Sequence, residues 1–142
     1  MKQLALLTLV LAATPAFASA DRTPQPGGVY RLKPGIYAEK GQACATAPFA
    51  AIREYDGIGI STPHTRTCRA RVLSRRGKTY RVTQTCLDAG SGPAKPFTQR
   101  QTVVVDDAID FRQTIAGATT RYRYCPASEL SPDMRKDVYY PK

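Results

Sequence analysis

The chain has 142 residues, including four cysteines, one histidine and no tryptophan, and its formal net charge is +10. A chain of this length forms one domain with a modest core, and its positive surface attracts polyanions and repels other basic proteins. It contains no GxSxG motif, Gly-rich phosphate loop, HExxH motif or EF-hand loop, so we predict that it is not an enzyme and binds no cofactor.

The first twenty residues, MKQLALLTLVLAATPAFASA, have the three parts of a secretory signal peptide. Lys2 supplies the positive start, and the apolar run Leu4–Ala13 is too short to cross a bilayer. Small residues fill the cleavage positions, and we expect cleavage after Ala20, with Ala18 as the other site. The sequence therefore predicts a periplasmic or secreted protein.

The exported part begins with a polar leader, residues 21–28, which is rich in proline and glycine. We expect a single β domain over residues 29–142, with no second linker and no internal repeat. No other apolar run approaches the length of a transmembrane segment, so none is predicted in the mature chain.

Four cysteines lie in the predicted exported part, an even number that indicates two disulfides in an oxidising compartment. They are Cys44, Cys68, Cys86 and Cys125. No two of them form a CxxC pair, and His64 is the only histidine. Because structural zinc usually takes closely spaced Cys or His pairs, we predict no metal site.

Two arguments about the disulfide pairing disagree. The hairpin around Gly77 puts Cys68 opposite Cys86, whereas the hairpin at Asp56–Gly57, extended backward, puts Cys44 near Cys68. Directly opposed cross-strand bridges are geometrically demanding, so we favour Cys44–Cys68 with Cys86–Cys125. The pairing Cys68–Cys86 with Cys44–Cys125 stays open.

Short runs rich in Val, Ile, Thr and Tyr recur along the chain, separated by turns with Gly, Pro or Asp. About eight such strands predict an all-β fold, a small antiparallel β-barrel or sandwich. Asp56–Gly57 is the strongest hairpin signal. The expected strands cover residues 29–32, 35–39, 49–56, 57–62, 65–73, 79–86, 99–107, 109–116 and 119–125.

One short helix is expected at the C-terminus, in the sequence SPDMRKDVYY. Ser131 suits the cap position, Pro132 the first turn, and Asp133 the positive end of the helix. The glycines and prolines of residues 87–97 predict a loop.

The segment RTCRARVLSRRGKTYRV, residues 66–82, holds seven positive charges, and no Asp or Glu occurs between Asp56 and Asp88. In an antiparallel hairpin Val72 faces Val82, and alternation places the arginines on the solvent side, with Leu73 as an exception. This pattern predicts an anion-binding face. Its candidate residues are Arg69, Arg71, Arg75, Arg76, Lys78 and Arg81. A solvated face that binds nothing is the competing interpretation.

We therefore expect an exported, non-enzymatic binding protein of the bacterial cell envelope. Its basic hairpin would bind an anionic envelope component, which is a polysaccharide, a lipid headgroup or an acidic protein. Nucleic acid is not the expected partner, because export removes the chain from most of it.

Three other functions stay open. One is a lipocalin-like carrier, since a barrel of eight strands is wide enough to hold one small ligand. In size, export signal, paired cysteines and β texture, the chain is similar to small barrel inhibitors of lysozyme or proteases, with residues 61–67 and 87–97 as inhibitory loops. The positive charge argues against a basic lysozyme as target. A small basic ribonuclease is the remote alternative, with Glu54, His64 and Arg66 as the residue types that its chemistry needs.

Overall fold

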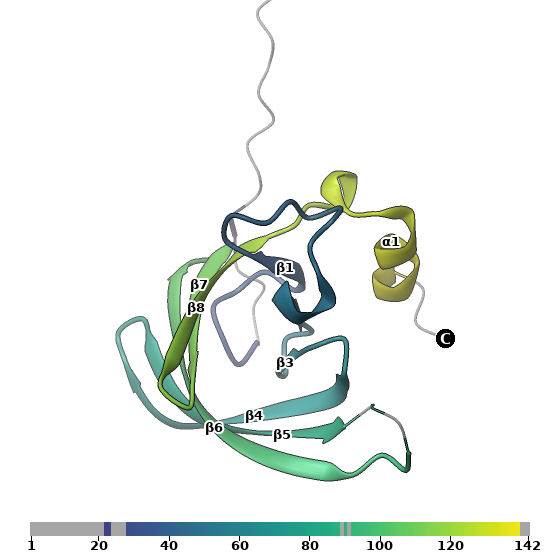
Figure 1. The fold of residues 1–142 in the computed structure, drawn as a ribbon. Coiled ribbons are helices and arrows are strands. Elements are labelled where there is room, and N and C mark those ends of the chain that lie inside the picture. The colour runs from purple at the N-terminus through teal and green to yellow at the C-terminus, as the bar shows by residue number, and fades with distance from the viewer. Residues whose placement is uncertain (1–21, 24–27, 89, 91, 140–142) are drawn as a thin grey trace, which may run out of the picture.

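Within the described residues, eight antiparallel strands form one sheet that curls into a nearly closed barrel (Figure 1). The strand order is β3-β2-β1-β8-β7-β6-β5-β4, so all strands from β4 to β8 pair with their neighbours in sequence. This confirms the predicted all-β barrel. The elements are β1 (Gly35–Glu39), η1 (Phe49–Ala51), β2 (Ile52–Tyr55), β3 (Ile60–Ser61), β4 (Thr65–Arg76), β5 (Thr79–Asp88), β6 (Pro96–Asp107), β7 (Asp110–Ile115), β8 (Ala118–Tyr124), η2 (Ala127–Glu129) and α1 (Pro132–Tyr139).

This computed structural model describes residues 22–23, 28–88, 90 and 92–139. The predicted signal peptide, residues 1–20, and most of the predicted leader lie outside the described residues. Among the helices that are described, none is long and apolar enough to cross a membrane.

The barrel closes between the edge strands β3 and β4. The backbone N–H of Ala70 donates to the carbonyl of Ile58 (3.0 Å). Next to it, the side-chain amide of Gln84 on β5 bonds both backbone groups of Ile60: Nε2 donates to the carbonyl (2.7 Å), and Oε1 accepts from the N–H (2.8 Å). Because buried backbone groups need partners, this side chain completes the hydrogen bonding that another strand would supply.

Residues 28–34 cross one end of the barrel (Figure 1), and the side chains of Tyr30 and Leu32 join the core there. Tyr30 and Leu32 are each 1% exposed. The backbone N–H of Tyr30 donates to the hydroxyl of Tyr55 (2.9 Å), and Lys33 N–H donates to the carbonyl of Ala108 (2.7 Å). The predicted strand over residues 29–32 is therefore wrong, because this segment bonds to groups at the rim and not to a neighbouring strand.

Aromatic side chains from most of the strands fill the interior around this segment. Tyr37 packs edge-on against Phe111 (5.1 Å between ring centroids), and Phe111 stacks on Tyr122 (5.1 Å). The other members of this cluster are Tyr30, Leu32, Tyr55, Ile60, Tyr80, Val82, Val103 and Val105. Dense aromatic packing leaves most arginines of the alternating strands on the outside.

A second apolar cluster covers the outer side of β1 and β2. Ile36, Ala38 and Ile52 point away from the barrel and pack under the chain between β1 and β2 and the C-terminal segment. The predicted helix forms as α1, and Ser131 caps it: its Oγ accepts from the N–H of Met134 (3.3 Å). Met134 in turn packs against the cluster, so the helix is held to the barrel by this contact.

Strand β4 carries a bulge at Thr67, whose φ of +49° is unusual for a residue with a side chain. The pairing with β5 steps from Arg66–Leu87 to Arg69–Thr85, so two residues of β4 face one of β5. The extra residue shifts Cys68 away from the position directly opposite Cys86. The geometric objection to a bridge between these two cysteines therefore no longer applies.

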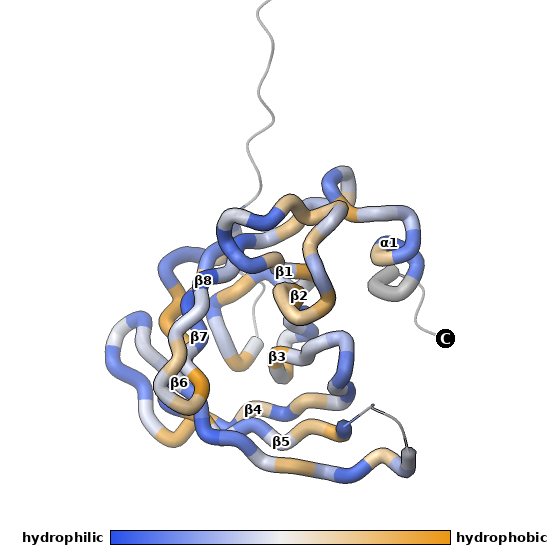
Figure 2. The backbone as a smooth tube through the Cα atoms, in the orientation of Figure 1, coloured by the Kyte–Doolittle hydropathy of each residue, from blue (hydrophilic) through white to orange (hydrophobic). Residues whose placement is uncertain are grey.

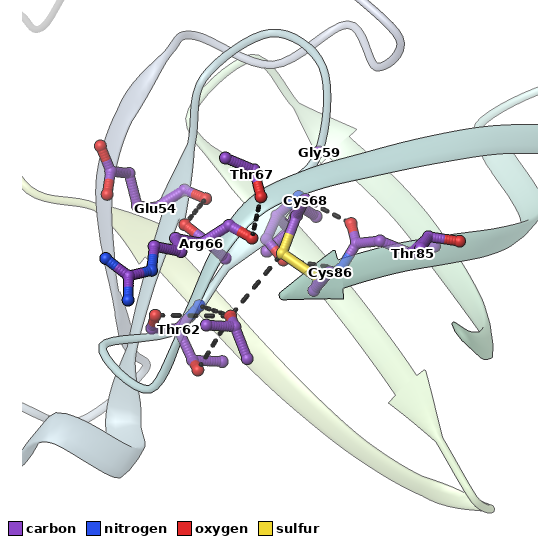
Figure 3. The surroundings of a disulfide bond; sticks show 12 residues. Glu54, Gly59, Thr62, Arg66, Thr67, Cys68, Thr85 and Cys86 are labelled. Carbon is purple, nitrogen blue, oxygen red and sulfur yellow. Dashed lines mark hydrogen bonds between the residues drawn. A yellow bond between two sulfur atoms is a disulfide. The ribbon is translucent and has the colours of Figure 1, made fainter. Parts of the chain in front are cut away.

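The four cysteines, all of them in the described part of the chain, form the disulfides Cys68–Cys86 and Cys44–Cys125. The favoured pairing of Cys44 with Cys68 is therefore wrong. The bulge accommodates Cys68–Cys86 across the hairpin, with the Cα atoms 4.1 Å apart (Figure 3). Gly59 lies against this bridge, where an added Cβ would stand 2.4 Å from the Cys68 carbonyl oxygen. Cys44 leaves the sheet after β1 and meets Cys125 in the outer cluster.

Replacing Gln84 by methionine tests the closure of the barrel. Gln84→Met keeps the volume but leaves two buried backbone groups of Ile60 without a partner, so the free energy of unfolding should fall by about 2–4 kcal/mol. Urea unfolding measures the loss. Gln99→Met is the matched control, because Gln99 pairs with Gln84 on β6 but is only half-buried, and it should change stability by less than about 0.5 kcal/mol. Equal effects of the two changes would contradict the role of Gln84.

Tyr30 gives a prediction for alkaline pH. Its hydroxyl is buried with no partner among the described residues, and burial raises its pKa. The folded chain therefore holds the phenolic proton more tightly than the unfolded chain, whose tyrosines have a pKa of about 10. Stability should be full below about pH 10 and fall above it, by about 1.4 kcal/mol per pH unit for each such tyrosine.

Tyr30→Phe removes this group without breaking a side-chain hydrogen bond. It should leave stability at neutral pH within about 0.5 kcal/mol of the wild type and make the alkaline fall shallower. Urea unfolding from about pH 8 to about pH 11 checks both. Tyr37→Phe is the contrast, because it removes bonds to the carbonyls of Lys33 (2.6 Å) and Ala108 (3.2 Å) and should destabilise at neutral pH too. An unchanged alkaline slope in Tyr30→Phe would contradict the prediction.

Candidate functional site

The outer face of β4, β5 and β6 is fixed by alternation along β5. Tyr80, Val82, Gln84 and Cys86 are buried inside the barrel, so the residues that alternate with them, such as Arg81, Thr83 and Thr85, face outward. The pairing carries this alternation to both neighbours, and Figure 2 shows hydrophilic positions interspersed with hydrophobic ones along these strands. Five exposed arginines share the outer face and are called the Arg face: Arg69, Arg71, Arg76, Arg81 and Arg100.

Hydroxyl side chains separate these arginines. Thr83 on β5 pairs with Arg71 on one side and with Arg100 on the other, so the three side chains form one row across the sheet. In the next row the hydroxyls of Thr85 and Thr98 bond to each other (2.8 Å). The face thus presents guanidinium and hydroxyl groups in alternation, both of which bind oxygen-rich ligands.

No carboxylate compensates the Arg face. Among the described residues, none of its five arginines forms an ion pair. On the same side of the sheet, the carboxylate of Asp106 accepts two bonds of 2.8 and 3.1 Å from Arg112. Asp110 lies beyond it at the β6–β7 turn, where burial and the neighbouring Asp107 raise its pKa. Positive and negative charges are therefore segregated along the sheet.

A groove of about 350 Å³ opens on the Arg face beside the β7–β8 turn. One wall comes from a second bulge in β4, between Val72 and Ser74, where Leu73 faces outward and is 51% exposed. Leu73 keeps the outward position that alternation predicts, and the bulge brings Ser74 to the same face. Arg81 and Arg100 line the groove from β5 and β6. Ser74, Thr102, Thr114, Ala116 and Gly117 also line it.

Two of the predicted anion-binding residues lie elsewhere. The second bulge reverses the alternation, so Arg75 points toward the barrel rim, with its guanidinium 4.8 Å from the centre of the Tyr80 ring. The Lys78 ammonium donates to the carbonyl of Asp106. Both residues line a second groove, of about 420 Å³, together with Arg22 and Arg31, which we call the rim groove. The other four, Arg69, Arg71, Arg76 and Arg81, belong to the Arg face.

Arg100 is the residue that the sequence analysis missed. It lies on β6, in a run for which alternation was visible but no partner strand had been assigned. The tendency of consecutive strands to pair would have placed this run beside β5 and Arg100 beside Thr83. Arg121 and Arg123 on β8, by contrast, lie three strands from β5 and do not extend the Arg face.

One arginine lies inside the barrel. Arg53 stacks on the Tyr122 ring (4.8 Å) and donates to the Gln113 side-chain oxygen (3.1 Å), and Gln113 donates in turn to Gln101. Burial lowers the pKa of the guanidinium. Because arginine only donates, this chain of bonds fixes the orientation of both amides and leaves the Gln101 amide nitrogen without a partner among the described residues. No sequence pattern predicted this network.

The residues of the ribonuclease alternative come from one region of the surface. Glu54 on β2 and Arg66 on β4 lie on the same side of the chain near the disulfide (Figure 3). His64 is exposed in the loop before β4, and its backbone N–H donates to the Thr62 hydroxyl (3.3 Å). The pairing of Thr65 with Asp88 brings this loop beside the one that joins β5 to β6, so both loops of the inhibitor alternative lie at one end of the barrel.

Comparisons of this chain with protein-family models, with curated proteins and with solved structures find no match. Any role for the Arg face therefore has to be argued from its own geometry and charge.

The uncompensated charge of the Arg face should lower stability at low salt. Arg71→Gln removes one of several like charges and should stabilise the protein by up to about 0.5 kcal/mol at low ionic strength, with the gain vanishing in concentrated salt. Arg112→Gln is the control on the same face. It breaks the bonds to Asp106 and should destabilise by up to about 1 kcal/mol. Urea unfolding at two salt concentrations measures both. Destabilisation by Arg71→Gln would show that Arg71 has a compensating contact.

Proposed function

We propose that this is an exported, non-enzymatic binding protein of the bacterial cell envelope that holds an anionic partner on the Arg face. One observation carries the proposal: five outward arginines lie on three adjacent strands with no ion pair among the described residues. Solvated faces usually mix charges of both signs, which the Arg face does not.

The dimensions of the face favour an extended partner. Arg69 lies near the middle of β4 and Arg76 at its end, roughly 20 Å apart at the usual rise per strand residue. Guanidinium groups bind phosphate and carboxylate with two parallel bonds, and the intervening threonines can bond to sugar hydroxyls. An anionic polysaccharide or the headgroup layer of an anionic glycolipid matches this spacing better than a single small anion does.

The chemistry of the face supports binding over catalysis. Arginine stays protonated at any physiological pH, so it cannot act as a general base. The threonines have no adjacent base to activate them, and Thr85 and Thr98 bond to each other. The Arg face therefore has groups to hold a ligand and none to transform it.

Two further features support export. The N-terminal sequence has the pattern of a signal peptide, and all four cysteines are paired in disulfides, as is usual in oxidising compartments. An anionic component of the envelope would then be the abundant partner within reach.

A pull-down from envelope extract tests the proposal. The purified protein is immobilised beside a variant with Arg69, Arg71, Arg76 and Arg81 changed to serine, and the captured material is assayed for phosphate and uronic acid. The wild type should retain anionic glycan or glycolipid at low salt and release it at high salt, and the variant should retain little, because each lost arginine removes a phosphate or carboxylate contact.

The control removes the same charge elsewhere. A variant with Arg31, Lys95, Arg135 and Lys136 changed to serine has the same net charge, but its substitutions lie outside the Arg face and on exposed side chains. It should bind as the wild type does. If both variants lose the captured material equally, net charge alone is responsible, and the proposal fails.

A further inference from the structure

We propose that the groove between the β4 bulge and the β7–β8 turn binds the phosphate group of a phosphorylated hexose. This rests on the proposed function, because it places one group of the anionic partner at a defined point of the Arg face. The groove is the place where that face is concave, and it has the volume of a small ligand site.

The position of two arginines supports an anion at this point. Arg81 pairs with Thr102, and Arg100 pairs with Thr83, so the two arginines are diagonal neighbours on adjacent antiparallel strands. Such neighbours lie about 7–8 Å apart, a separation at which two long side chains can meet at one anion. Both line the groove, and no acid is among its described lining residues.

The charge of the groove favours phosphate over carboxylate. A phosphate monoester carries a charge of about −1.5 to −2 at neutral pH, close to that of the two guanidinium groups together. It also has three terminal oxygens, enough to accept bonds from both arginines at once. One carboxylate would leave about half of the positive charge of the groove uncompensated.

The remaining walls fit a sugar ring. The hydroxyls of Ser74 and Thr102 lie on either side of Arg81 and can donate to or accept from sugar hydroxyls, while that of Thr114 bonds to Thr119 (2.8 Å). Leu73, which faces outward and is half exposed, offers an apolar surface of the kind that packs against ring carbons. These features recognise more than a phosphate ion.

The β7–β8 turn keeps the groove open. Ala116 and Gly117 both have positive φ, +48° and +85°, as in the tight two-residue turns of hairpins. This conformation is uncommon for alanine, and the small side chain leaves the space in front of Arg81 and Arg100 free. Strained backbone of this kind is often found at functional sites.

Titration calorimetry with glucose 1-phosphate tests the site. The wild type should bind it more tightly than glucose or inorganic phosphate, because both parts of the groove contribute. Arg81→Gln with Arg100→Gln should weaken binding by about tenfold or more, since two charge-assisted contacts are lost. Arg135→Gln with Lys136→Gln removes the same charge from exposed side chains outside the Arg face and should leave the affinity within about threefold.

A second probe distinguishes the source of the sugar phosphate. Vesicles of phosphatidylcholine with and without lipid A present the same chemical group in a lipid headgroup. Binding of glucose 1-phosphate that depends on Arg81 and Arg100 supports a free sugar phosphate as ligand. Binding of lipid A vesicles alone, with the same dependence, supports the headgroup of a glycolipid.

Several results would overturn the inference. They are equal weakening by the two double variants, inorganic phosphate binding as tightly as glucose 1-phosphate, and binding of neither probe. None of these results tests the proposed function, which is tested by the envelope pull-down. If the pull-down captures anionic material through the Arg face but the groove binds no sugar phosphate, the proposed function holds and only the sugar-phosphate site is refuted.

Discussion

The rest of the structure depends on the closure of the barrel at Ile60. Strand β3 has only two residues and cannot pair along β4, so the Gln84 side chain supplies the missing backbone partners from β5. Because Gln84 must point into the barrel to make this contact, the even-numbered residues of β5 from Tyr80 to Cys86 all face the interior. Because a strand alternates strictly, the odd-numbered positions, Arg81 and Thr83 among them, must then face solvent. The same constraint that buries the tyrosines therefore builds the Arg face.

Local pattern was enough to predict the parts of the fold that depend on neighbouring residues. The β4–β5 register at Val72–Val82, the hairpin after Tyr55 and the cap at Ser131 all follow from alternation or turn chemistry. The bulges at Thr67 and Leu73 could not be predicted, because each inserts one residue for reasons of barrel curvature and not of local propensity. The bulge at Thr67 allows the Cys68–Cys86 disulfide, and the bulge at Leu73 turns Arg75 toward the barrel rim.

The candidate site was predictable only within one hairpin. Arg69, Arg71, Arg76 and Arg81 follow from a single pairing of strands, whereas Arg100 enters the face through a second pairing that alternation alone does not assign. The groove could not be predicted from the sequence, because it is formed by a bulge in β4 and a turn some forty residues later. Sites assembled from several strands depend on topology, which residue patterns specify weakly.

The separation of charge along the sheet is the strongest physical argument for a ligand. Arg112 forms an ion pair with the carboxylate of Asp106 on the same face. An outward arginine of this sheet can therefore have an acidic partner. The five arginines of the Arg face have no such partner among the described residues, although one acidic side chain on β5 or β6 would provide it. Leaving like charges together costs stability. A ligand that carries the opposite charge would offset this cost in stability when it binds. Without such a ligand, the unpaired arginines would only lower the stability of the protein.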